Sequence, residues 1–211
     1  MLNKKSNILV LCPHPDDEIG CGGLIAKLSE LGHSVYYSNF SNCAESTRAL
    51  GFEPDQLLYE MRLSCAQLGI DENRIISYDF PVRKFPQYRQ EILEEMVVLK
   101  NKIQPKLVLA PCSFDLHQDH MTIANEAMRA FKHSTILGYE FVWNSLKTEL
   151  NFFVQLDEHH LDSKLNSWEC YKSQQARPYH GPDIFRALAQ VRGLMVNVKF
   201  AEAFEARRVI I

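Results

Sequence analysis

The sequence lacks the features that mark membrane proteins, cysteine-based metal or redox proteins, and general nucleic-acid binders. No apolar run approaches the roughly 18 residues that a membrane-spanning helix needs. The six cysteines are scattered and form no C-x-x-C pair, which argues against a zinc ribbon or a dithiol redox site. No stretch is dense in lysine or arginine, and the formal net charge is −3, so the sequence gives no sign of a nucleic-acid partner.

Targeting signals and linkers are missing as well. Lys4 and Lys5 precede the apolar run Ile8–Cys12 as in a signal peptide, but the run is too short and acidic residues follow it. We therefore expect a cytoplasmic protein whose cysteines are buried as small apolar side chains. No repeat and no linker rich in glycine, proline or serine divides the 211 residues, of which 46% are hydrophobic and 23% charged. These values predict a single domain over residues 1–211.

Apolar runs alternate with amphipathic stretches along the chain. Strands are expected at Ile8–Pro13, Val35–Phe40, Arg74–Phe80, Leu107–Pro111, Thr135–Val142, Phe152–Leu156 and Arg207–Ile211. Helices are expected at Asp17–Leu31, Pro54–Leu68, Gln90–Lys102, Gln118–Phe131, Glu158–Tyr171 and Asp183–Val196. This order predicts an α/β fold, a Rossmann-like three-layer α/β/α arrangement with a mainly parallel sheet.

Two clusters of histidine and acidic residues follow the first and the fourth expected strands. The first, in the string PHPDDE, contains His14, Asp16, Asp17 and Glu18. The second, in the string SFDLHQDH, contains Asp115, His117, Asp119 and His120. In sheets of this type ligands bind beyond the carboxyl ends of the strands, where the strand order reverses, and the first and fourth strands commonly flank that point. We therefore expect the two clusters to meet in one crevice.

Imidazole and carboxylate groups together suit a first-row metal ion such as zinc, and three protein ligands with one open position are typical of a catalytic site. His14 and Asp17 are three residues apart across a turn, so both side chains can point the same way, and His120 can supply a third ligand. Taken singly, the acids also suit a helix N-terminus and the histidines a solvated surface. The occurrence of both clusters at one sheet edge favours the metal site.

Three other features are weaker. Gly20, Gly22 and Gly23 do not fit the dinucleotide motif G-x-G-x-x-G, so we expect them to let the first helical turn pack close to the sheet. His159 and His160 also lie beside acids, but at the start of an expected helix, where acids are common. Basic residues in loops at the same sheet edge either bind an anionic part of a ligand or are simply solvated, namely Arg48, Arg83 and Lys84.

The two clusters resemble the paired signatures of the LmbE-like / PIG-L zinc-dependent deacetylases. PHPDDE resembles the family's A-H-P-D-D-E, and HQDH resembles its H-P-D-H, in the same order and after corresponding strands. The segments YEMRLSCAQLG, YKSQ and AEAF also resemble family segments. The resemblance implies the LmbE-like deacetylase fold and the removal of an N-acetyl group from a small-molecule amino sugar or sugar conjugate.

The resemblance also assigns roles, including one zinc ion per chain. The implied zinc ligands are His14, Asp17 and His120. Asp16 is the implied general base, and His117 the group that polarises the carbonyl or protonates the leaving amine. Asp119 is expected either to orient a histidine through its other ring nitrogen or to cap the following helix. Arg83 and Arg48 are the candidate substrate-binding residues.

One departure from the family bears on the substrate. Many members carry an arginine three residues before a helical glutamate, and Leu57 stands at that position before Glu60. The exact substrate therefore stays open, as does the formation of a homo-oligomer. The alternatives are a non-catalytic sugar- or nucleotide-binding domain and an amide hydrolase with a non-sugar substrate. The carboxylate of Asp16 argues against a binding domain, which needs no spare acid beside a metal.

Overall fold

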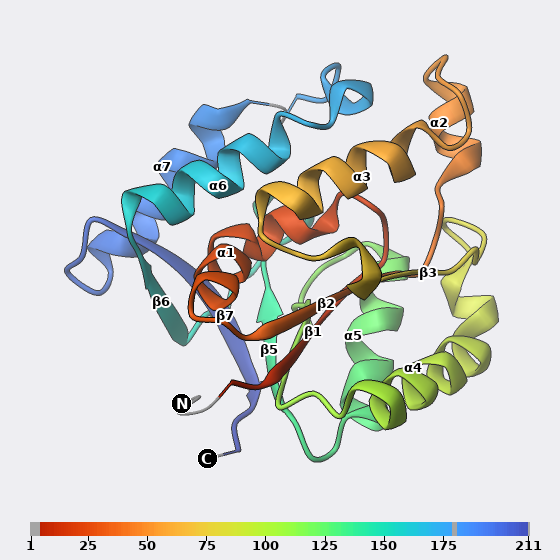
Figure 1. The fold of residues 1–211 in the computed structure, drawn as a ribbon, viewed down its shortest axis with the longest axis horizontal. Helices are drawn as coiled ribbons and strands as arrows, with labels where there is room; N and C mark the ends of the chain where they lie inside the picture. The colour runs from red at the N-terminus through yellow and green to blue at the C-terminus, as the bar shows by residue number, and fades with distance from the viewer. Residues whose placement is uncertain (1–4, 179–180, 211) are drawn as a thin grey trace.

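A central sheet of seven strands runs through the part of the chain that the computed structural model describes, residues 5–178 and 181–210 (Figure 1). Its strands are β1 Asn7–Cys12, β2 Ser34–Asn39, β3 Ile75–Ser77, β4 Leu107–Pro111, β5 Thr135–Tyr139, β6 Phe152–Leu156 and β7 Phe200–Arg208. The helices are α1 Gly22–Glu30, α2 Ala44–Ala49, α3 Gln56–Gln67, α4 Arg89–Ile103, α5 Gln118–Ala130, α6 Glu158–Trp168 and α7 Pro182–Leu194. The strand order is β3-β2-β1-β4-β5-β7-β6.

The first five strands are parallel, which confirms the expected mainly parallel α/β sheet. The chain moves outward from β1 to β2 and β3, then returns to place β4 against the other side of β1. The strand order therefore reverses between β1 and β4. Because both strands point the same way, the loops after them emerge side by side, as the sequence predicts for the two clusters.

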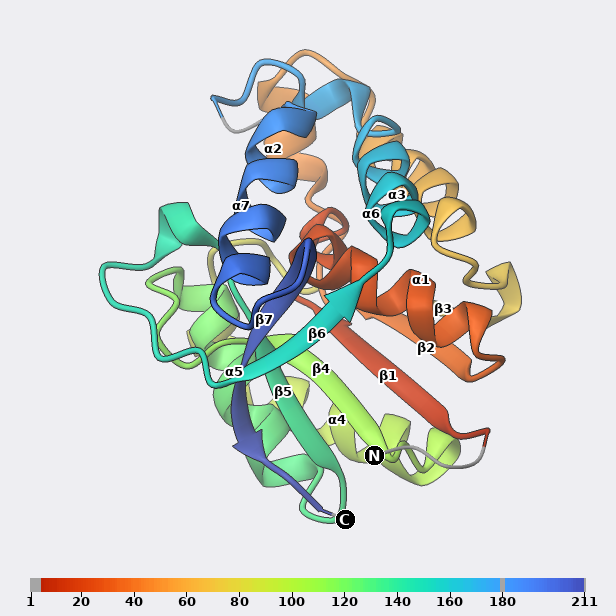
Figure 2. The same cartoon turned by 90° about the vertical axis from the view of Figure 1, so that its left-hand side faces the viewer.

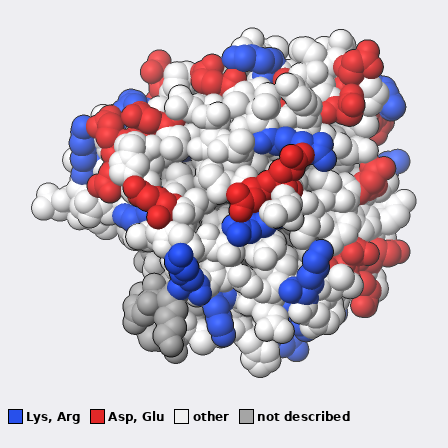
Figure 3. All heavy atoms as spheres, viewed as in Figure 1, with Lys and Arg blue, Asp and Glu red and all other residues white. Residues whose placement is uncertain are grey.

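Helices cover both faces of the sheet (Figure 2). Alternate residues of β1 enter different cores: Ile8 and Val10 pack on one side with α1, α3, α6 and α7, whereas Leu9 and Leu11 pack on the other side with α4 and α5. This period of two explains why a strand buried on both faces reads as a continuous apolar run. Within the described ranges, no helix combines the length and the apolar character needed to cross a membrane. Acidic and basic side chains are interspersed on the face seen in Figure 3.

The last two strands differ from the expectation. β7 pairs antiparallel with both β5 and β6, and it begins at Phe200 rather than at Arg207. The expected strand Arg207–Ile211 was therefore placed too late, and Ile211 itself lies outside the described residues. The physical reason is a charge inside the strand: Glu202 is buried, and its carboxylate pairs with Lys164 at 2.7 Å. A buried strand is normally recognised by its apolar run, and Glu202 interrupts that run. The lysine that neutralises it is distant in the sequence, so the strand could not be recognised there.

The expected helix Asp17–Leu31 is divided into a 3-10 helix, Asp17–Cys21, and α1. The glycines at this junction allow close packing, as expected. A methyl group on Gly20 would lie 2.6 Å from Cδ2 of Tyr139 on β5, and one on Gly23 would overlap Leu156 on β6. The junction therefore holds the PHPDDE loop firmly against the sheet. The short helix α2 was not expected from the sequence, while the strands expected at 74–80 and 135–142 are shorter in the structure.

Candidate active site

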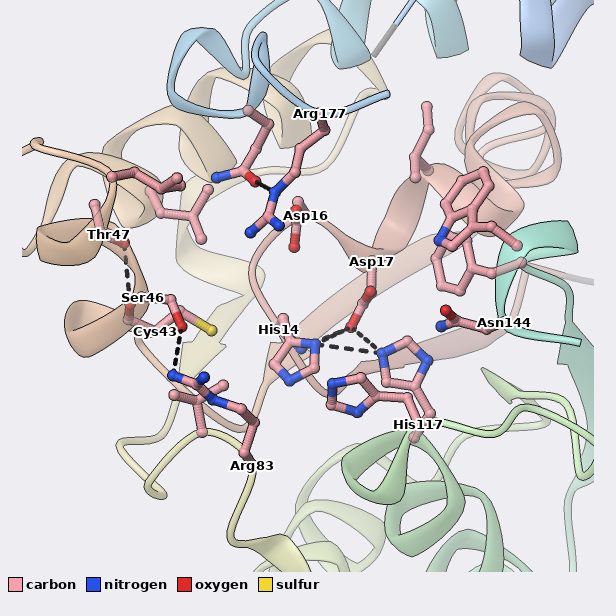
Figure 4. A pocket seen from close by; sticks show the side chains of 18 of the residues that line it. His14, Asp16, Asp17, Cys43, Ser46, Thr47, Arg83, His117, Asn144 and Arg177 are labelled. Atoms are coloured by element: carbon pink, nitrogen blue, oxygen red, sulfur yellow. Dashed lines mark hydrogen bonds and ion pairs between the residues drawn. The ribbon is translucent and has the colours of Figure 1, made fainter. Parts of the chain in front are cut away.

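A pocket of about 340 Å³ lies beyond the carboxyl ends of β1 and β4 (Figure 4). The polar side chains that line its floor come from both sequence clusters: His14, Asp16, Asp17, His117 and His120. Aromatic side chains line another part of the pocket: Phe141, Trp143 and Trp168. The structure thus brings together residues about a hundred positions apart in the sequence, as the strand order requires.

Three side-chain atoms in this pocket converge on one point. Nδ1 of His14 lies 3.1 Å from Oδ2 of Asp17 and 3.3 Å from Nε2 of His120, and Nε2 of His120 lies 3.3 Å from the same Oδ2. Zinc bonds of about 2.0–2.1 Å at tetrahedral angles place two ligand atoms roughly 3.3–3.4 Å apart. The three atoms therefore have the spacing of one face of a tetrahedron around a single metal ion.

Two buried carboxylates fix how the two imidazoles face this point. Nε2 of His14 is 3.1 Å from Oδ2 of Asp119, and Nδ1 of His120 is 2.7 Å from Oδ2 of Asp115. Each carboxylate accepts an N–H, so the other ring nitrogen presents its lone pair to the shared point. This geometry is that of two metal-ligating histidines with orienting partners. The sequence suggested no role for Asp115, because its place in the string does not show which histidine it contacts.

The helix cap of α5 is His117 rather than Asp119. Nδ1 of His117 accepts the backbone N–H of Asp119 at 3.2 Å. Asp119 uses its carboxylate elsewhere: besides His14, Oδ2 accepts the N–H of Arg83 at 2.6 Å and Oδ1 that of Phe85 at 3.2 Å. Asp119 was expected either to cap the helix or to orient a histidine. Its side chain contacts His14, which fits the second role.

The charges of the site favour a bound cation. Burial lowers the pKa of His14, but the carboxylates of Asp17 and Asp119 together outweigh this and bring the pKa to about 9. Burial also lowers the pKa of His120, and the carboxylates of Asp17 and Asp115 together bring it to about 10. Burial raises the pKa of Asp17, yet the two imidazoles hold it well below its usual range. Positive charge stabilises this site, whether as protons or as a metal ion.

Asp16 and His117 line the same pocket but do not share the converging point. Burial and the charge of Asp17 raise the pKa of Asp16 to about 6. Burial, together with His14 and His120, lowers the pKa of His117 to about 4. His117 is therefore a neutral imidazole at pH 7, and since its Nδ1 accepts a hydrogen bond, its Nε2 carries the proton. The ligand atoms of His14, His117 and His120 also lie within 4.8 Å of one another, while Oδ2 of Asp17 lies 3.1 Å from His14 and 3.3 Å from His120.

Glu18 completes the first cluster without lining the pocket. Its carboxylate is fully buried and accepts hydrogen bonds from the hydroxyls of Ser64 on α3 and Tyr171 after α6. Burial raises its pKa to about 8. Glu18 therefore connects the PHPDDE loop to α3 and to the segment that follows α6, which keeps the neighbouring Asp16 and Asp17 in place.

The basic residues are distributed differently from the expectation. Arg83 lines the pocket, whereas Arg48 is exposed on α2 and is not among the lining residues. Another arginine, Arg177, does line the pocket. The sequence did not single it out, because it follows the short 3-10 helix Lys172–Gln174 and belongs to no strand-end motif.

The set formed by His159, His160 and Glu30 has a structural explanation without a metal. Nδ1 of His160 accepts the backbone N–H of Asp157 in a capping box, so its Nε2 carries the proton and donates it to Glu30 at 2.6 Å. A metal ion at Nε2 would require the proton to move to Nδ1, which already accepts a hydrogen bond. The three side chains thus join α1 to α6 through hydrogen bonds, although their ligand atoms also lie within 4.8 Å of one another.

Replacing Asp119 by asparagine is expected to weaken metal binding about 10–100-fold, as for other orienting partners of metal ligands. An amide has one acceptor oxygen, and it cannot satisfy His14 and the backbone N–H groups of Arg83 and Phe85 together. Competition with a chromophoric chelator measures the affinity. Asp71→Asn, at an exposed ion pair with Arg74, serves as control and should bind the metal as the unaltered protein does. Equal affinity in both variants would show that Asp119 does not orient His14.

Comparisons with known proteins agree with this site. The profile of the PIG-L family, described as GlcNAc-PI de-N-acetylase, matches residues 9–131. Diacetylchitobiose deacetylase from Thermococcus kodakarensis is 30% identical over 148 residues, which cover 66% of this chain and 50% of that protein. The chain thus spans about half the length of that relative.

Two solved structures share the fold. The conserved protein TT1542 from Thermus thermophilus has a TM-score of 0.81 at 22% identity, with 98% of this chain and 96% of that chain covered. GalB, the 4-carboxy-2-hydroxymuconate hydratase from Pseudomonas putida KT2440, has a TM-score of 0.78 at 16% identity, with 98% of each chain covered. The second comparison shows that this fold also carries other chemistry, so function has to be argued from the site.

Proposed function

Because the chain belongs to the PIG-L family of de-N-acetylases, we propose that it is a zinc-dependent hydrolase that removes the N-acetyl group from an amino sugar or its conjugate. The observation that carries the proposal is the convergence of His14, Asp17 and His120 in the pocket that Asp16 also lines. Their nitrogen and oxygen donors suit zinc, and one ion per chain fills the converging point. Held by these three side chains, such an ion would supply polarisation of the amide carbonyl and a bound water molecule whose pKa is about 7.

Asp16 acts as the general base. Its carboxylate lines the pocket without belonging to the ligand triangle, so it is available to take a proton from the attacking water. A pKa of about 6 leaves it ionised at pH 7 and basic enough for proton transfer. Hydroxide adds to the carbonyl carbon, and the proton held by Asp16 then passes to the amide nitrogen as the C–N bond breaks. The products are acetate and the free amine.

His117 stabilises the charge that develops on the carbonyl oxygen. Its neutral ring donates from Nε2, because Nδ1 is occupied by the N–H of Asp119. The loss of one such donor in acyl-transfer enzymes costs about 3–4 kcal/mol of activation free energy. A neutral donor is a weaker acid than an imidazolium, so the proton for the leaving amine is assigned to Asp16 instead.

The remaining lining suits a sugar. Phe141, Trp143 and Trp168 present apolar aromatic surface to the pocket, and Asn144 adds an amide. A pyranose ring has apolar faces and hydroxyl edges, which match a wall of this composition. The aromatic wall and the metal site lie in one pocket, so a ring that packs on the wall has its N-acetyl group within the same cavity.

An acetate-release assay tests the proposal. The zinc-loaded protein should release acetate from N-acetylglucosamine, N,N′-diacetylchitobiose or simple N-acetylglucosaminides, and a chelator should stop the release. Acetate or another acid from non-sugar amides alone would contradict the sugar substrate and support a different amide hydrolase. Sugar binding without acetate release from any compound would contradict catalysis and support a binding domain.

A further inference from the structure

Two arginine side chains reach the pocket from separate parts of the chain. Arg83 follows β3, and Arg177 follows the 3-10 helix Lys172–Gln174. Figure 4 shows them approaching from opposite walls, with Asp16, Ser46 and Cys43 nearby and Asn144 at the other end of the pocket. In the described part of the chain, they are the two lysine or arginine residues that line this pocket.

Neither guanidinium forms an ion pair with a carboxylate in the part of the chain that the structure describes. Most arginines of the chain form an ion pair with a carboxylate, namely Arg62, Arg74, Arg89, Arg129, Arg186, Arg192 and Arg207. No ion pair between residues of the described ranges includes Arg83 or Arg177. The charge of Arg177 does lower the pKa of Asp16, but neither guanidinium is in ion-pair contact with a carboxylate of the described residues, so together they attract an anion to the pocket they share.

The backbone holds Arg83 in an unusual conformation. Its φ of 67° lies in the left-handed region that L-residues rarely adopt, and no glycine is used there. The conformation is maintained by Oδ2 of Asp119, which accepts the Arg83 N–H at 2.6 Å and also contacts Nε2 of His14. Strain of this kind concentrates at ligand-binding positions. One carboxylate thus sets the position of both the arginine loop and a metal ligand.

Arg177 is held by a chain of hydrogen bonds that begins on α3. Glu60 is buried, and its carboxylate accepts the N–H of Ser173 at 2.9 Å and its hydroxyl at 2.6 Å. The next residue, Gln174, accepts Nε–H of Arg177 at 3.2 Å. Among the described residues, none accepts a hydrogen bond from the two terminal nitrogens of this guanidinium, so both can serve a ligand. They form the fork that binds carboxylate or phosphate with two parallel hydrogen bonds.

We infer that Arg83 and Arg177 bind an anionic group of the substrate, a phosphate or a carboxylate, at the end of the pocket away from Asn144. The preferred substrate is therefore an N-acetylated amino sugar that carries such a group. The inference rests on the proposed deacetylation for the acetyl part and adds the second recognition element. The anion lies beyond the sugar, so it contributes to substrate binding and does not take part in amide cleavage.

Matched charged and neutral substrates test the inference. The phosphate comparison uses N-acetylglucosamine 6-phosphate and 1-phosphate against N-acetylglucosamine, and the carboxylate comparison uses a carboxyethyl N-acetylglucosaminide against its amide. At least one charged compound should exceed its neutral partner in kcat/KM by about 10–100-fold, mainly through KM. The comparison with the larger charged-to-neutral ratio of kcat/KM shows whether the site prefers a phosphate or a carboxylate.

Variants of the two arginines then show whether these residues cause the preference for charged substrates. Arg83→Gln and Arg177→Gln should each lower the charged-to-neutral ratio about tenfold, because each removes one charged donor. Arg62→Gln is the matched control: Arg62 lies on α3 outside the pocket, where it pairs with Glu72, and its variant should keep the ratio. A ratio that survives in both pocket variants would overturn the assignment.

The outcomes separate this inference from the proposed function. Equal turnover of charged and neutral sugars would contradict the anion site but not the proposed deacetylation. If no compound releases acetate, deacetylation fails, and calorimetric binding of glucosamine 6-phosphate against glucosamine decides the inference instead. Phosphate-dependent binding that Arg177→Gln abolishes would uphold the anion site, and equal binding of the two sugars would overturn it.

Discussion

The variant Asp16→Asn is expected to lose about 10²–10⁴-fold in kcat while it keeps its metal ion and its thermal stability. Asparagine has nearly the shape of aspartate but accepts no proton at neutral pH. The metal should remain because Asp16 is outside the triangle of His14, Asp17 and His120. Acetate release and elemental analysis of the same preparation give the two readouts, with the exposed Asp55→Asn as control.

The pH profile of the unaltered protein gives the same assignment a second test. Asp16 must be ionised to accept a proton, so kcat/KM should fall as the pH falls through the pKa of Asp16. Burial and Asp17 raise that pKa to about 6, and the charge of a bound cation moves the acidic limb to lower pH. If kcat/KM did not decrease on acidification in protein that keeps its metal, Asp16 would not be the general base.

The variant His120→Ala is expected to lose both the metal and the metal-dependent turnover. It removes one of the three proposed metal ligands and leaves Asp115, now without its imidazole partner, buried beside the site. Elemental analysis should find about one zinc per chain in the unaltered protein and almost none in the variant. The residual rate should equal that of chelator-treated protein. His133→Ala, at an exposed histidine before β5, should retain the metal.

The two variants are most informative together. If Asp16→Asn emptied the site as His120→Ala does, Asp16 would be a ligand and the base would have to be sought elsewhere. If His120→Ala kept a full equivalent of zinc, the triangle would not be the metal site. Retained metal in the first variant and lost metal in the second is the pattern that separates a base from a ligand.

The sequence by itself determined the parallel core of the fold and the two histidine and acidic clusters that meet in the pocket. Strands buried on both faces give continuous apolar runs, so β1 and β4 could be recognised without any long-range contact. Once their order along the chain is known, the general rule for such sheets places the loops after them together. The pairing of the PHPDDE and HQDH strings at one crevice followed from local patterns and topology alone.

Only the tertiary structure decided what depends on contacts between distant residues. Glu202 reads as a solvated charge until Lys164 is seen against it, and β7 was therefore misplaced. Arg177 has no motif, and its position in the pocket depends on the hydrogen bonds that lead from Glu60. The neutral state of His117 follows from burial and from two other histidines. Periodicity is a local property of a chain, whereas desolvation, charge pairing and side-chain direction arise only when the elements pack.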